Sequence, residues 1–149
     1  MTRPSEVKPR EGSAPGTPYA TYVVGTELPE LRFTVTPAIV EEYMAAVQAD
    51  PSVYRIDGRK VAPPNVLCVF MTALIYRKYP PIQGIVMYEI DMESHNPIWA
   101  DEETDVVATG RVTGKSEKRG RYFIHWEAEY RRGDGTLLAR LRNTFNVPE

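Results

Sequence analysis

Cysteine is nearly absent from this sequence, because its 149 residues contain only one, Cys68. A single cysteine cannot form an internal disulfide, a pattern typical of a protein of the reducing cytoplasm. Histidine is also scarce: His95 and His125 are the only two, and they lie far apart in the sequence. One cysteine and two separated histidines do not have the ligand spacing of a structural zinc site. We therefore expect a cytoplasmic protein with no disulfide framework and no metal.

An excess of charge of one sign is missing as well. Eighteen basic residues stand against 20 acidic ones, which gives a formal net charge of −2. Nucleic-acid-binding domains usually carry a basic excess or stripe, so a nucleic-acid partner is not expected. The longest apolar run, Val66 to Tyr76, is interrupted by Thr72 and is shorter than the roughly 20 residues that span a bilayer. Residues 1–18 also lack the apolar segment of a secretory signal. We expect no membrane span and no signal peptide.

The length of the chain fits a single domain. Residues 1–18 are rich in proline, glycine, serine and charge, and this composition predicts a disordered or loosely docked tail. The domain itself is then expected over residues 19–149.

Hydrophobic spacing predicts the first elements of this domain. Residues 31–36 alternate apolar and polar side chains, as a short strand does. A helix is expected to begin at Thr36-Pro37, because threonine caps helices and proline fits the first helical position. It is expected to end at Asp50-Pro51, since the residue before a proline avoids helical backbone. Residues 51–64 are a loop with a turn at Asp57-Gly58, either a lip over a site or a plain connector.

Residues 65–79 are the most apolar segment and predict one long helix between two proline pairs. A helix that is apolar on all sides must be buried on most of them. Further strands are predicted over residues 85–92, 104–115, 121–132 and 136–147. The last three strands are joined by short turns, so they form an antiparallel meander with one face to be covered. The predicted fold class is α+β: a curved antiparallel sheet wrapped round a long apolar central helix.

A sheet curled round a central helix is the hotdog fold, and three stretches of this chain resemble a MaoC-like domain of that fold. They are APPNVLCVFMTALIY (62–76), GIVMYEIDMESHNPIWADEE (84–103) and ATGRVTGKSEKRGRYFIHWEAEYRRGDGTLLARLRNTF (108–145). The shared features are Ala-Pro-Pro before the central helix, the turn His95-Asn96-Pro97, and Glu-Lys-Arg-Gly at 117–120. The chain is most similar to the N-terminal, FAS1-type dehydratase half of the (R)-specific enoyl-thioester hydratase/dehydratase superfamily.

The resemblance implies action on acyl thioesters of coenzyme A or acyl carrier protein, with no cofactor beyond the thioester substrate. The reaction is the reversible hydration of a trans-2-enoyl group. Active members carry an Asp and a His in a pattern like Asp-Phe-Asn-Pro-x-His before the central helix. The chemistry needs both, because a carboxylate and an imidazole together hold one water, remove its proton and return a proton to the α carbon.

This chain departs from that pattern, since Gln48 and Val53 stand at the acid and imidazole positions. Val53 cannot exchange a proton, and Asp50 stands where the pattern has Asn. The resemblance therefore implies a half without its own acid–base pair, which shapes the acyl pocket beside a catalytic hotdog subunit in a heterodimer or heterotetramer. Substrate contacts are expected from the loop and from the start of the central helix. The residues in question are Tyr54, Pro63, Pro64 and Asn65.

Two other functions remain open: a self-sufficient homodimeric hotdog enzyme that uses Asp50 or His95, and a thioester-binding module without chemistry. His95 is either a general base or a turn histidine, whereas His125 is expected to be a solvated or interface residue. Cys68 is expected to serve packing. The basic residues of the hairpin region either meet the phosphates of coenzyme A or form a solvated edge. They are Arg111, Lys115, Lys118, Arg119 and Arg121.

Overall fold

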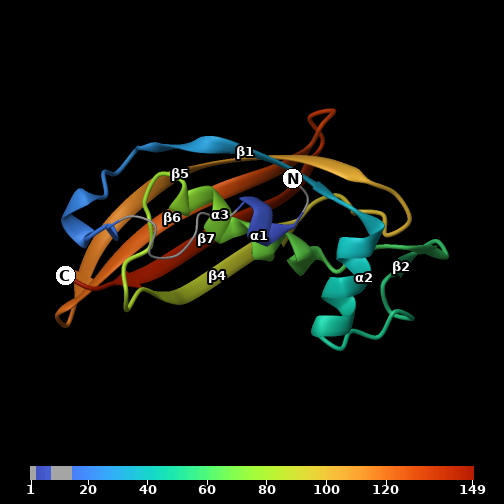
Figure 1. Ribbon diagram of the computed structural model, residues 1–149, viewed down its shortest axis with the longest axis horizontal. Helices are drawn as coiled ribbons and strands as arrows, with labels where there is room; N and C mark the ends of the chain where they lie inside the picture. The colour runs from blue at the N-terminus through green and yellow to red at the C-terminus, as the bar shows by residue number, and fades with distance from the viewer. Residues whose placement is uncertain (1–2, 8–14) are drawn as a thin grey trace.

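The computed structural model describes residues 3–7 and 15–149 of the chain. Five strands form one antiparallel sheet in the order β1–β5–β6–β7–β4; α3 and α1 lie over one face of it, and α2 lies at one end beside β2 (Figure 1). The strands are β1 (Glu27–Val35), β4 (Val86–Ser94), β5 (Thr104–Lys118), β6 (Arg121–Arg132) and β7 (Leu137–Val147). The helices are α1 (Pro4–Val7), α2 (Pro37–Ala46) and α3 (Met71–Tyr76), with 3-10 segments η1 (Tyr19–Thr21) and η2 (Pro64–Phe70). The α+β class is confirmed.

The meander of β5, β6 and β7 agrees with the prediction from alternating side chains. On the inner face of β6, Ile124, Trp126, Ala128 and Tyr130 are buried, and Trp126 lies between Val112 of β5 and Asn143 of β7. Arg119 and Gly120 form the β5–β6 turn with φ angles of 53° and 70°. These left-handed values match the right-handed twist of the flanking strands, so a tight hairpin closes there.

The central segment differs from the single long helix that was predicted over 65–79. It consists of the seven-residue 3-10 helix η2 followed by the six-residue helix α3. The first turn is tightened because the Val66 N–H donates to the carbonyl of Pro63, three residues back, at 3.0 Å. Such 3-10 turns are common at helix starts. The prediction of burial holds for most of the segment, but Val69 is 37% exposed.

Helix α2 begins as predicted and ends earlier than predicted. The Thr36 hydroxyl accepts the Ile39 N–H at 3.2 Å, and Pro37 occupies the first turn. The helix stops at Ala46 rather than at Asp50-Pro51. Gln48 adopts a φ of 54°, and the Ala49 N–H donates to the Met44 carbonyl at 2.9 Å. This is a Schellman closure, which ends a helix without any need for proline.

Of the tail predicted over 1–18, residues 1–2 and 8–14 lie outside the described residues. Thr17 is buried, and its N–H donates to the Pro80 carbonyl at 2.9 Å. Lys115 anchors η1 to the sheet, since its ammonium donates to the Tyr22 carbonyl at 3.0 Å and lies 4.2 Å from the centre of the Tyr19 ring.

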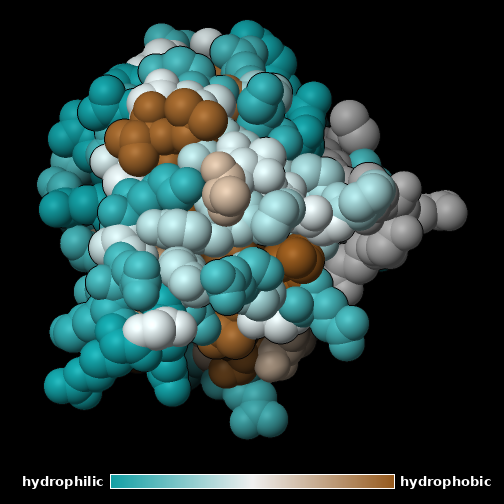
Figure 2. All heavy atoms as spheres, turned by 90° about the vertical axis from the view of Figure 1, so that its left-hand side faces the viewer, coloured by the Kyte–Doolittle hydropathy of each residue, from teal (hydrophilic) through white to brown (hydrophobic). Residues whose placement is uncertain are grey.

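The end of the molecule that carries η1 and the C-terminus has a largely hydrophilic surface. Hydrophobic atoms appear there as separate patches rather than as one continuous face (Figure 2). Within residues 3–7 and 15–149, no helix is long and apolar enough to cross a membrane.

Candidate functional site

A hollow of about 600 Å³ lies between α2 and the loop that follows it; we call it the α2 hollow. Its apolar lining residues are Pro37, Val40, Met44, Ala45, Ala49, Pro51, Val61 and Ala100. Four polar residues complete it: Glu41, Gln48, Tyr54 and Lys60. Hollows that bind small organic molecules are similarly apolar with a few polar groups. The α2 hollow can therefore receive an apolar chain with a polar end.

A smaller hollow of about 190 Å³, the η2 hollow, lies at the start of η2 beside the end of β4. Pro64 and Leu67 of η2, Met92 of β4, and His95 are among its lining residues. Val61 lines both hollows, so the two adjoin along one segment.

The wall between the hollows is a small hairpin made of β2 (Arg55–Ile56) and β3 (Arg59–Lys60). Asp57 and Gly58 form its turn with φ angles of 48° and 79°, which confirms the predicted turn. The loop predicted over 51–64 is thus partly ordered as strand. Its exposed Ile56 lines the η2 hollow and its Lys60 lines the α2 hollow.

Arg59 fastens this hairpin to the segment before β5. Its guanidinium donates to Asp101 at 2.8 Å and Glu102 at 2.9 Å, and it lies 4.2 Å from the centre of the Trp99 ring. The hydrogen bond from Arg59 holds the pKa of Asp101 below its usual range. The backbone also joins the hairpin to this segment, because the Ala100 N–H donates to the Lys60 carbonyl at 3.1 Å. The Arg59 side chain and this backbone hydrogen bond therefore hold the wall of both hollows in place.

Replacing Arg59 by alanine should loosen the hairpin without unfolding the domain. We expect several-fold faster hydrogen exchange of the backbone amides in residues 54–62, with exchange in β5 and β6 unchanged, because local opening follows local contacts. The matched control is Arg55→Ala, because the Arg55 guanidinium donates to the Gly58 carbonyl within the hairpin itself. Equal exchange in both variants would show that Arg59 does not hold the wall.

Gln48 and Val53 stand at the two positions where active members of the resembled family carry an Asp and a His. Gln48 lines the α2 hollow, whereas Val53 is 67% exposed and lines neither hollow. Asp50 is exposed, and its carboxylate accepts the Ser52 N–H at 2.9 Å. This backbone hydrogen bond holds the pKa of Asp50 below its usual range. The carboxylate of Asp50 is thus used in its own turn and lies outside the linings of both hollows.

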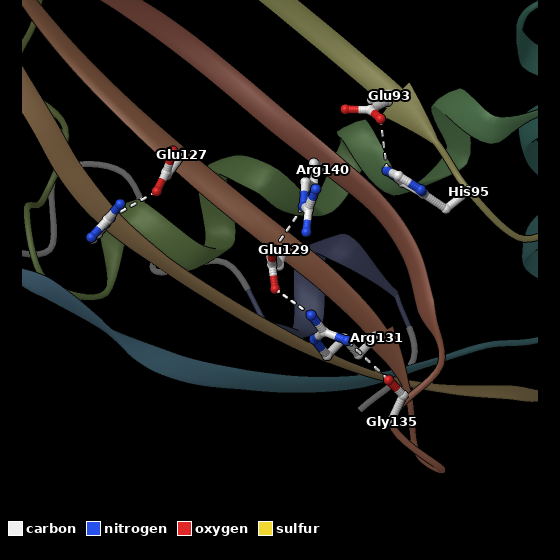
Figure 3. Close-up of polar contacts among 8 residues, drawn as sticks. Glu93, His95, Glu127, Glu129, Arg131, Gly135 and Arg140 are labelled. Atoms are coloured by element: carbon white, nitrogen blue, oxygen red, sulfur yellow. Dashed lines mark hydrogen bonds and ion pairs between the residues drawn. The ribbon is translucent and has the colours of Figure 1, made fainter.

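His95, the other fallback candidate, lies apart from these positions at the end of β4. Its Nε2 is 3.1 Å from a carboxylate oxygen of Glu93, and its side chain is 28% exposed (Figure 3). Its backbone N–H donates to the Leu138 carbonyl at 2.8 Å. It is therefore a turn histidine that also lines the η2 hollow, and the structure does not bring it together with Asp50 in one lining.

The four expected substrate contacts are divided between the hollows. Tyr54 is half-buried and lines the α2 hollow, and Pro64 lines the η2 hollow. Pro63 is buried, and Asn65 is exposed and lines neither. How these residues act on a ligand stays a prediction.

Sequence reasoning missed several lining residues. Glu41 and Met44 are two of them; with Gln48, which the resemblance had already placed at the acid position, they follow one another at spacings of three and four along one face of α2 and into its closing turn. The helical spacing in the sequence could have predicted these lining residues. The role of Arg59 could not have been predicted in this way, because 42 residues separate it from Asp101.

The remaining candidates have structural roles. His125 is half-buried on the outer face of the sheet, where its ring nitrogens lie 2.8 Å from the Ser116 hydroxyl and 3.0 Å from the Thr144 hydroxyl. Cys68 packs with its sulfur 3.7 Å from that of Met92, and burial raises the pKa of its thiol. Arg111 is paired with Glu127. Among the described residues, no group of three histidine, cysteine, aspartate or glutamate side chains is placed to hold a metal ion.

Known structures share this fold. The (R)-hydratase PhaJ1 from Pseudomonas aeruginosa is 15% identical, with a TM-score of 0.69 over 90% of this chain and 87% of that one. A MaoC-like dehydratase from Rhodospirillum rubrum is 15% identical, with a TM-score of 0.70 over 89% and 97%. The HadBC (3R-hydroxyacyl-ACP dehydratase) complex from Mycobacterium tuberculosis contains a chain that is 18% identical, with a TM-score of 0.70 over 85% and 98%. No protein-family model and no curated protein matches the sequence. At these identities the comparison establishes the hotdog fold of MaoC-like dehydratases and (R)-hydratases.

Proposed function

We propose that this chain is the non-catalytic half of an enoyl-thioester hydratase or dehydratase, which shapes the acyl pocket beside a catalytic hotdog subunit. One observation carries the proposal. The α2 hollow has the size and apolar lining of a ligand pocket, but Gln48 stands in it where active members have their acid, and Val53 points to solvent away from it. A ligand pocket that lacks the acid and the imidazole of the active members is what a supporting half requires.

The substrate proposed is an acyl thioester of coenzyme A or of acyl carrier protein. Its apolar chain would lie against Val40, Met44 and Ala49, with Tyr54 and Lys60 toward the polar end. The thioester end would lie toward Pro63, Pro64 and Asn65 at the start of η2. Two of these three residues are prolines, which have no N–H to polarise a carbonyl. Because few backbone N–H groups are available there to polarise the thioester carbonyl, this end of the chain is better suited to binding the substrate than to activating it.

The acid and base would come from the partner. A carboxylate and an imidazole on that subunit would hold a water molecule and take its proton as the oxygen adds to the β carbon, while the α carbon receives a proton. The residues of this chain would orient the acyl group and exclude bulk water. The HadBC complex is, by its name, a dehydratase complex, which supports an assembly with a second subunit.

The test is a hydration assay with a medium-chain and a bulky-ring trans-2-enoyl-CoA, followed by loss of the ultraviolet absorbance of the conjugated thioester. We expect no turnover by this chain alone and turnover when it is co-expressed with a hotdog chain that carries the Asp-x-x-x-x-His pair and is encoded beside it. Turnover by the isolated chain would overturn the supporting role. Thioester binding without turnover in both cases would identify a binding module.

A bulky side chain introduced into the α2 hollow tests whether this hollow is the acyl pocket. Met44→Trp should lower kcat/KM of the two-chain enzyme for the bulky-ring substrate roughly tenfold or more, with a smaller loss for the medium chain, since misfit in an apolar pocket costs rates of this order. Val47→Trp is the matched control, because Val47 directly follows the last residue of α2, is 51% exposed and lies outside the lining. Equal losses in the two variants would place the acyl chain elsewhere.

A second function is favoured by the pair of His95 and Glu93. A histidine oriented by a carboxylate and lining a hollow is arranged as a general base. If the isolated chain is active, the self-sufficient enzyme predicts that His95→Ala abolishes that activity while Asp50→Asn leaves it intact.

A further inference from the structure

Two polar side chains are buried next to each other on the inner face of the sheet without a hydrogen-bond partner. Asn143 of β7 is 3% exposed and Trp126 of β6 is 1% exposed, and the two lie directly opposite each other in the strand register. The amide nitrogen and oxygen of Asn143 and the indole nitrogen of Trp126 make no hydrogen bond within the described part of the chain. We call the place where these groups meet the Asn143 niche.

An unpaired amide in the core works against the stability of the fold. Buried polar groups are almost always paired, because an unpaired one has lost its hydrogen bonds to water without replacement. The other inner-face residues of β7 are apolar and buried: Ala139, Leu141, Phe145 and Val147. An apolar residue at position 143 would continue this row. The asparagine therefore points to binding rather than to packing.

The niche lies toward the side of the sheet that the central helix leaves less covered. Helix α3 packs on β1 and β5, whereas β7 and β4 lie at the other side of the sheet. Ile90 of β4 lies opposite Asn143 on the same face and is 41% exposed. Val69 of η2 is 37% exposed. Solvent therefore reaches the inner face of β4 next to the niche.

The η2 hollow leads toward the niche along β4 and β7. Met92 lines this hollow and lies opposite Leu141. Asn143 is the next inner-face residue of β7 after Leu141, so it lies about 7 Å further along the strand. The Met92 sulfur lies 3.7 Å from that of Cys68. A methionine side chain is unbranched and flexible, so a ligand in the hollow can displace it and reach the niche.

The unpaired groups of the niche match an oxygen atom on an otherwise apolar ligand. The indole and amide N–H groups are donors, and the amide oxygen is an acceptor. A hydroxyl group can use both kinds of partner, and a keto oxygen can accept from both nitrogens. An ionised group would be buried among apolar side chains at high cost. The niche therefore selects for a neutral oxygen.

We propose that the Asn143 niche binds a hydroxyl or keto oxygen carried on the apolar body of a ligand that enters through the η2 hollow. The inference rests on the proposed function for the class of ligand, an acyl thioester with its thioester end at the start of η2. Pro64 lines the η2 hollow at that point, so an acyl group can extend into this hollow as well as into the α2 hollow. The chain thus favours an acyl group that bears an oxygen at the right distance from the thioester.

The test compares dodecanoyl-CoA with a series of hydroxydodecanoyl-CoA isomers, each with its hydroxyl on a different carbon. Calorimetry measures their binding to the full chain. We expect at least one isomer to bind roughly tenfold more tightly than dodecanoyl-CoA, because a site with polar groups for a substrate hydroxyl rejects the analogue that lacks it. In Asn143→Leu, every isomer should bind with the same affinity as dodecanoyl-CoA.

The matched control is Asn146→Leu. Asn146 lies on the outer face of the same strand, where its amide donates to the Tyr122 carbonyl at 3.1 Å. This variant should keep the preference of the wild type for the same isomer. If the control also loses the preference, the effect of Asn143→Leu is not specific to the niche and the inference is overturned.

A second measurement needs no variant. The chain contains two tryptophans, Trp99 and Trp126, and so gives two indole N–H signals in an NMR spectrum. The preferred isomer should move the Trp126 signal downfield, because its N–H gains an acceptor, whereas dodecanoyl-CoA should not. A Trp126 signal that stays in place with every isomer would overturn the inference.

The affinities separate this inference from the proposed function. Equal binding of dodecanoyl-CoA and all of its hydroxylated isomers would overturn the niche and leave the acyl pocket standing. A preference that survives in Asn143→Leu would place the oxygen elsewhere and also overturn the niche. If none of the thioesters binds to the chain, the acyl pocket and the niche both fail.

Discussion

Replacing Leu74 by alanine should lower the free energy of unfolding by about 3–5 kcal/mol. Leu74 is fully buried in α3, the helix that packs on β1 and β5. Truncation removes apolar contacts and leaves a cavity, because the strands on one side and the helical segment on the other cannot both close the gap. Urea denaturation followed by circular dichroism measures the change as a shift of the midpoint at constant slope.

The control for this prediction lies in the same central segment. Val69→Ala shortens a side chain that is 37% exposed, so we expect a loss of less than about 1 kcal/mol. If the two substitutions cost the same, α3 does not supply the core against which the sheet is packed. The hollows would then lack a rigid base, since η2 continues directly into α3.

Replacing Gly110 by alanine should cost about 3 kcal/mol. A Cβ at this position would lie 2.6 Å from the backbone carbonyl oxygen of Glu127 and 3.2 Å from side-chain atoms of Leu28 and Leu74. The first contact is with the neighbouring strand's backbone, which cannot move without disturbing the β5–β6 ladder. Thermal and urea unfolding would both report the loss.

Gly114 of the same strand provides the comparison. There the nearest atom to an added Cβ is Cδ2 of the His125 ring, at 3.3 Å, and a half-buried ring can shift on the outer face. Gly114→Ala should therefore cost less than about 1 kcal/mol. A Gly110→Ala protein as stable as the wild type would mean that the strands separate locally at little cost.

Local patterns explain which parts of the fold could be predicted. The alternation along 121–132 predicted β6 and its buried face, because the strand period of two is a local property. The Thr36-Pro37 start of α2 was predicted for the same reason, since capping involves adjacent residues. The end of α2 was missed, because its closure depends on Gln48 adopting left-handed backbone, which glutamine does not signal.

The candidate site could be predicted only in part. The prediction that Gln48 and Val53 replace the acid and the imidazole came from the resemblance to MaoC-like domains, and it needed only the identity of the residues at two positions. The hollow that Gln48 lines depends on how α2 and the hairpin pack, and the hairpin is held by Arg59 through residues 42 positions away. A single sequence carries no signal for such a long-range pairing.

By itself, the sequence determined the α+β class, the meander and the buried central segment, because each depends on residue type and local period. Only the tertiary structure decided that η2 and α3 replace one long helix, that two hollows adjoin at Val61, and that β4 is the open edge. Those outcomes depend on which distant segments pack together.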